Sequence, residues 1–149
     1  MGINLKSRKV HYDPNYNKAI EFGIEWLISL FRHNPNYRTY EIVYIAVKSL
    51  MEFLNMVGRI DSKYADLKKI DNLFQMAIIF GQNIKLVTET SIPLDGQNRP
   101  ILALFPTKEF LTRLDEIPEI SEMMVISSDP HEMISERVDQ ACYPTGDWN

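Results

Sequence analysis

A change in the spacing of apolar residues at Ile84 constrains most strongly what this chain can fold into. Before Ile84, apolar residues recur at helical spacing over long stretches. After it, short apolar or β-branched runs follow one another, separated by turn and helix-start signals, which is typical of strands in a sheet. We therefore predict a helical first half and a second half with three strands, over residues 84–92, 101–105 and 123–126.

The segments between these strands predict how they are joined. The turn at residues 94–98 (LDGQN), in which Gly96 can supply a positive φ, predicts an antiparallel hairpin between the first two strands. The second strand runs directly into a helix start at Thr107, so the second and third strands should be parallel and joined by a right-handed βαβ crossover. The Ser-Asp-Pro sequence at 128–130 predicts a last helix over about residues 129–141.

Three helices are predicted in the first half, over residues 15–33, 39–57 and 62–80. In the first two, polar residues occupy one narrow stripe, so most of each helix surface must be covered. The predicted fold class is α+β: an N-terminal three-helix half packed on a small mixed β-sheet, with two further helices. The predicted parts of this single domain are an arm at 1–14 that can hold one short strand, the helical half 15–81, the ββαβα half 82–141 and an irregular tail at 142–149.

The charge of the chain changes from basic to acidic along its length. Residues 1–60 hold eight Lys or Arg and five Asp or Glu, whereas residues 107–149 hold three and ten. Phosphate binding needs basic residues concentrated on one face, so nucleic acid is not an expected partner. Cys142 is the single cysteine and cannot form an internal disulfide, and no apolar run approaches the roughly 20 residues that span a bilayer. We expect a soluble, cytoplasmic protein without a membrane partner.

The sequence contains no recognisable motif for catalysis, metal binding or cofactor binding. The three histidines, His11, His33 and His131, are far apart, and His131 lacks a second histidine one helical turn away. The serines lie in no Gly-x-Ser-x-Gly turn, and the isolated glycines form no phosphate-binding loop. We therefore assign no catalytic residue, no metal site and no cofactor.

One group of residues could form a ligand site. If strands 101–105 and 123–126 are parallel neighbours, the residues that follow them lie together at the carboxyl ends of the strands, where open α/β sheets bind ligands. Two helix N-termini would direct backbone N–H groups into this crevice. The same residues are also explained as helix caps, so both interpretations remain open. The candidate ligand-binding residues are Thr107, Lys108, Ser127, Ser128 and Asp129.

The second half also has a resemblance to a known family. Over residues 95–141, the order of turn, apolar strand, Phe105-Pro106-Thr107, helix, strand and helix resembles the small domains of the enhanced-serine-sensitivity type. The matching residues are few and structural, so the resemblance implies no activity, ligand or site residue. Residues 1–80 have no counterpart in it.

The expected function is that of a non-catalytic interaction or regulatory protein, acting as a homodimer or with a protein partner. The two apolar helices carry more apolar surface than a three-stranded sheet can cover, and large exposed apolar patches mark interfaces. The alternative is a small-ligand-binding protein or an enzyme that uses the crevice. The expected interface residues are Phe22, Trp26, Leu30, Val43, Val47 and Phe53.

Overall fold

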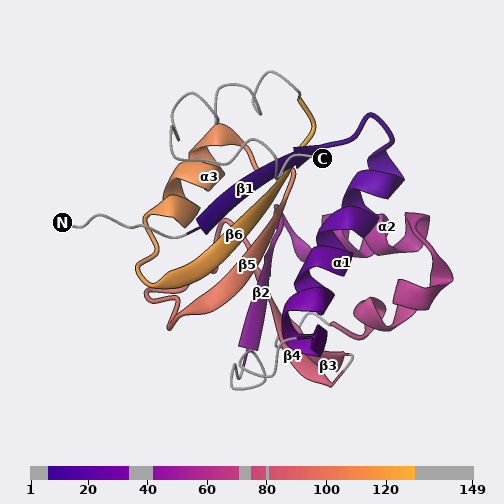
Figure 1. Cartoon of the computed structure of the whole chain (residues 1–149), viewed down its shortest axis with the longest axis horizontal. Helices are drawn as coiled ribbons and strands as arrows, with labels where there is room; N and C mark the ends of the chain where they lie inside the picture. The colour runs from indigo at the N-terminus through magenta and orange to yellow at the C-terminus, as the bar shows by residue number, and fades with distance from the viewer. Residues whose placement is uncertain (1–6, 34–41, 71–74, 80, 130–149) are drawn as a thin grey trace.

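The computed structural model of the chain describes residues 7–33, 42–70, 75–79 and 81–129, and these residues form a mixed α/β fold around one six-stranded sheet (Figure 1). The strands are β1 (Ser7–Tyr12), β2 (Ile42–Ala46), β3 (Met76–Ile79), β4 (Gln82–Val87), β5 (Arg99–Leu104) and β6 (Ile120–Ser127). The helices are α1 (Tyr16–His33), α2 (Leu50–Arg59), the 3-10 helix η2 (Ser62–Lys69) and α3 (Lys108–Asp115).

The strand order in the sheet is β1-β6-β5-β2-β4-β3. The first five strands in this order pair in parallel, and only β3, at one edge, is antiparallel to its neighbour β4. In Figure 1 the indigo β1 lies beside β6, the last strand described, so the sheet brings together segments from opposite ends of the chain. Sheets that are mainly parallel are usually covered on both faces, which agrees with the continuous apolar runs in β2, β5 and β6.

Helices lie on both faces of this sheet. On the first face, α1, α2 and η2 pack on residues of β2, β4, β5 and β6 and form the larger core cluster. Here α1 lies so close to the sheet that a Cβ on Gly23 would be 2.8 Å from Leu102 Cδ1 and 2.9 Å from Ile126 Cγ1. On the second face, the buried Phe110 and Leu114 of α3 pack in a separate core cluster.

Two of the helices predicted in the first half are wrong in part. Residues 42–46, expected in the helix 39–57, form β2, and α2 begins only at Leu50. Similarly, the helix expected over 62–80 is the 3-10 helix η2, and residues 76–79 form β3. A strand buried on both faces is apolar at every position, so a short apolar run does not distinguish it from a buried helix. The helix predicted over 15–33 agrees with α1, and the strand allowed for in the N-terminal arm is β1.

The predicted hairpin between strands 84–92 and 101–105 is also wrong. β4 does not pair with β5, because β2 lies between them; β4 instead pairs antiparallel with β3, next to Gly81, which has a φ of 80°. Gly96 does not adopt a positive φ; the left-handed residues in this turn are Gln97 and Asn98. A Cβ on Gly96 would collide with the Ile120 side chain and lie 2.7 Å from the backbone oxygen of Glu119, so this position requires glycine for space rather than for φ.

The strands expected at 101–105 and 123–126 correspond to β5 and β6, which are parallel neighbours with α3 between them in sequence. β5 pairs with β6 from Arg99 opposite Ile120 to Leu104 opposite Ile126, with one irregularity in register near the start. The side chain of Asp115, at the end of α3, pairs with the guanidinium of Arg8 in β1, which fixes α3 to the edge of the sheet. The helix predicted over 129–141 and the tail at 142–149 lie outside the described residues, apart from Asp129.

Candidate functional site

The five parallel strands all end at one edge of the sheet, and three helices begin there. We call the residues that directly follow β1, β2, β4, β5 and β6 the carboxyl edge. The chain continues from β1 into α1, from β2 into α2 and from β5 into α3. Because β2 and β5 are neighbours while α2 and α3 pack on opposite faces, the sheet has a topological switch point between these two strands. Ligands of open α/β sheets bind outside the carboxyl ends of strands at such points.

The β5 side of the switch point contains two of the predicted site residues. The Thr107 hydroxyl accepts a hydrogen bond of 3.1 Å from the backbone N–H of Phe110, so Thr107 is the N-cap of α3. Lys108, the first residue of α3, is exposed. The Thr107 hydroxyl is thus occupied by the cap, which leaves the exposed Lys108 and the backbone N–H groups at the start of α3 as the groups that this corner offers to a ligand.

The other three predicted residues lie at the end of β6, on the opposite side of β5 from the switch point. Phe105 donates a backbone hydrogen bond of 2.8 Å to Ile126, which holds the two strand ends side by side. Ser127 is buried, and its hydroxyl accepts from the backbone N–H of Asp129 at 3.1 Å and donates to the Asp129 carbonyl at 3.0 Å. Ser128 is exposed. The structure therefore brings the five predicted residues to neighbouring strand ends. The Ser127 hydroxyl, however, is hydrogen-bonded to the backbone of its own turn.

The β2 side of the switch point was missed by sequence reasoning, which placed it inside a helix. Lys48 is exposed, and Ser49 is the N-cap of α2, with its hydroxyl accepting from the backbone N–H of Glu52 at 3.2 Å. The signal was present in the sequence, because Ser49 and Glu52 have the S-x-x-E spacing of a capping box. This corner resembles the β5 corner: each has a strand, a short turn, a helix with a hydroxyl cap, and a lysine next to the cap, before it in Lys48 and after it in Lys108.

A third turn at the carboxyl edge follows β4, the other neighbour of β2. Thr88 is buried, and its hydroxyl lies 2.8 Å from the Ser91 hydroxyl and 3.3 Å from that of Thr90. The Thr88 backbone N–H donates to the Ser91 hydroxyl at 3.0 Å. These hydroxyls bond to one another and to the backbone of their own turn, so they stabilise the turn that follows β4.

A stack of two aromatic rings and one guanidinium connects α1 and α2 to the end of β5. The Tyr16 ring, at the start of α1, stacks on the Phe105 ring with centroids 4.7 Å apart, and the Arg59 guanidinium lies 5.4 Å from the Tyr16 centroid. Burial raises the pKa of the Tyr16 phenol, with the Arg59 charge acting in the opposite direction. Phe105 has a φ of 52°, which is uncommon for a bulky residue. No local sequence signal indicated this conformation.

The charges at the switch point are mixed. Helix N-termini carry a partial positive charge, to which the exposed Lys48 and Lys108 add. Glu52 and Glu109, in the first turns of α2 and α3, oppose them. Such a site can attract an anion through backbone N–H groups and two lysines, at an affinity reduced by the two carboxylates.

The six residues predicted as an interface separate into two groups. Val43, Val47 and Phe53 are fully buried within the chain, which corrects their assignment to a surface: all three pack in the core cluster between the first face of the sheet and its helices. Phe22 is 36% exposed, while Trp26 and Leu30 are partly buried against the first core cluster. Phe22 also stacks on His11 of β1, with ring centroids 3.6 Å apart; burial lowers the pKa of His11, and Asp13 acts in the opposite direction.

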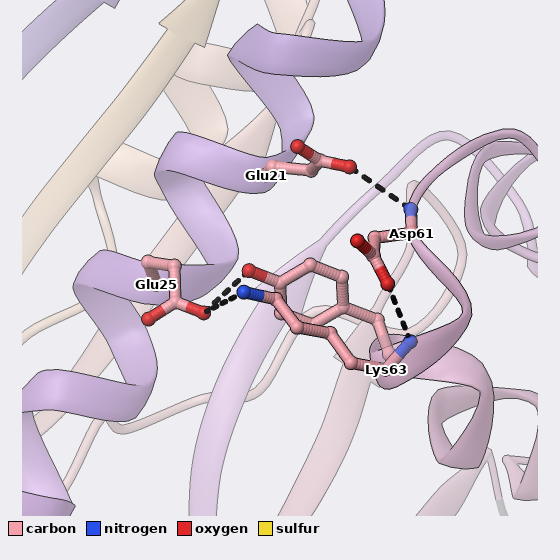
Figure 2. A network of polar contacts seen from close by, with 5 residues as sticks. Glu21, Glu25, Asp61 and Lys63 are labelled. Carbon is pink, nitrogen blue, oxygen red and sulfur yellow. Dashed lines mark hydrogen bonds and ion pairs between the residues drawn. The ribbon is translucent and has the colours of Figure 1, made fainter.

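A polar network on α1 has a structural role away from the carboxyl edge. Figure 2 shows Glu25 of α1 facing the 3-10 helix η2, where the Tyr64 hydroxyl donates to its carboxylate and Lys63 Nζ lies 3.9 Å away. Glu21 accepts a hydrogen bond of 2.9 Å from the backbone N–H of Asp61, and Asp61 caps η2. Burial raises the pKa of the Tyr64 phenol, and its hydrogen bond to Glu25 raises it further. These contacts join α1 to η2. They give Glu21, Glu25 and Asp61 a structural role, so no ligand is needed to account for this group of carboxylates.

No family model, no curated protein and no solved structure matches the chain. Among the described residues, no group of three or more His, Cys, Asp or Glu is placed to hold a metal ion. No helix in the same part of the chain is long and apolar enough to cross a membrane.

Proposed function

We propose that this chain binds a small, negatively charged ligand at the carboxyl edge of its sheet, between the ends of β2 and β5. The observation that carries this proposal is the switch point: α2 and α3 begin at neighbouring strand ends and pack on opposite faces. The two helices start next to each other and then separate to opposite faces of the sheet. The N–H groups at both N-termini can therefore bind the same ligand.

The residues at this point divide into two roles. Ser49 and Thr107 position the helix starts, because their hydroxyls bond backbone N–H groups of their own helices. Lys48 and Lys108 supply positive charge that attracts the anionic ligand, and the carboxylates of Glu52 and Glu109 reduce the affinity for it. The proposed function is binding, and the proposal assigns the role of nucleophile or general base to none of these residues.

The experiment is an NMR titration of the full chain with inorganic phosphate, followed by inorganic pyrophosphate. We expect the largest amide shifts at residues 48–50 and 107–109. Replacing both lysines (Lys48→Gln with Lys108→Gln) should weaken binding about tenfold or more, which corresponds to about 1.4 kcal/mol or more.

The matched control for this titration is Lys68→Gln with Lys69→Gln. It removes the same charge from exposed positions on η2, and an exposed pair such as Lys69 with Asp66 contributes little to stability. The control should bind both anions like the wild type. If both double variants lost anion affinity equally, only the net charge of the chain would matter. If the amide shifts were confined to residues other than 48–50 and 107–109, the anion would bind elsewhere. Either result would refute the proposal.

A second candidate function is association, without catalysis, with a second copy of the chain or with a protein partner. One observation favours it: Phe22, Trp26 and Leu30 recur at steps of four along α1, and Phe22 remains 36% exposed. Residues at this spacing lie on one side of a helix, and a partly exposed stripe of large apolar side chains that includes aromatic rings is typical of a contact surface.

Light scattering at micromolar concentration tests self-association through this stripe. A homodimer should show twice the chain mass, and Phe22→Ser should return it to the monomer. Met51→Ser, on α2, removes a more exposed apolar side chain and should leave the dimer intact. A wild-type monomer would exclude self-association at that concentration.

A further inference from the structure

We draw no further inference here: the strongest candidate, the exposed apolar side of the edge strand β3 around Ile78, is a surface for which nothing in the described part of the structure shows what covers it.

Discussion

The two faces of the sheet are covered in different ways. On the first face, α1, α2 and η2 form a layer of three elements that contact the sheet and one another, with Gly23 allowing α1 to approach closely. On the second face, the one described helix is α3, an eight-residue element with two fully buried side chains. A layer of several elements distributes its stability over many contacts, whereas a short helix depends on a few anchors. The three predictions that follow test this contrast, from the largest effect to the smallest.

The largest effect is expected on the second face. Phe110→Ala should lower the free energy of unfolding by about 3–5 kcal/mol, because it removes one of the two anchors of α3. Urea denaturation measures this loss. Hydrogen exchange should show that amides of α3 lose protection before those of α1. Leu111→Ala, at a half-buried position of α3, should cost clearly less. Earlier loss of protection in α1 than in α3 would contradict the contrast between the faces.

The second prediction concerns the close approach of α1 on the first face. Gly23→Ala should destabilise the chain by about 1–3 kcal/mol, because the added methyl group would overlap Leu102 and Ile126. Gly58→Ala is the matched control: Gly58 lies in α2 with no atom within 4 Å of an added Cβ, so alanine should stabilise by up to about 1 kcal/mol through helix propensity. Thermal and urea denaturation of both variants measure the two signs. Stabilisation by both changes would show that α1 is not packed as closely as the structure indicates.

The smallest effect is expected at the polar contact between α1 and η2. Tyr64→Phe should cost about 1 kcal/mol near neutral pH, because it removes the hydroxyl that donates to Glu25. The pKa of Tyr64 is raised in the folded chain, so its contribution is complete below the unfolded value of 10.0 and is lost as pH rises above it. Urea denaturation between pH 8 and pH 11 should therefore show a steeper loss in the wild type than in Tyr64→Phe. Parallel curves for the two proteins would argue against this hydrogen bond.

The β5 and β2 units show why part of the site could be predicted and part could not. The apolar run of β5 is followed by Pro106 and the cap Thr107, so the boundary between strand and helix is marked in the sequence. The apolar run of β2 continues through Val47 and resumes at Leu50, and the only mark between them is Lys48-Ser49. Without a proline, the strand and the helix merge into one long apolar segment, and half of the switch point is hidden inside it.

The sequence by itself determined the features that depend on neighbouring residues: the cap of α3, the extended β5 and β6, the amphipathic α1 and the strand in the N-terminal arm. Strand order was decided only by tertiary structure, because pairing β1 with β6 and inserting β2 between β4 and β5 leaves no local pattern. The same holds for Gly96, where glycine is required by the nearby backbone of Glu119 and side chain of Ile120, and for Phe105, whose left-handed backbone accompanies its stack on Tyr16. Local propensity acts over a few residues, whereas packing between segments distant in sequence selects among the arrangements that propensity leaves open.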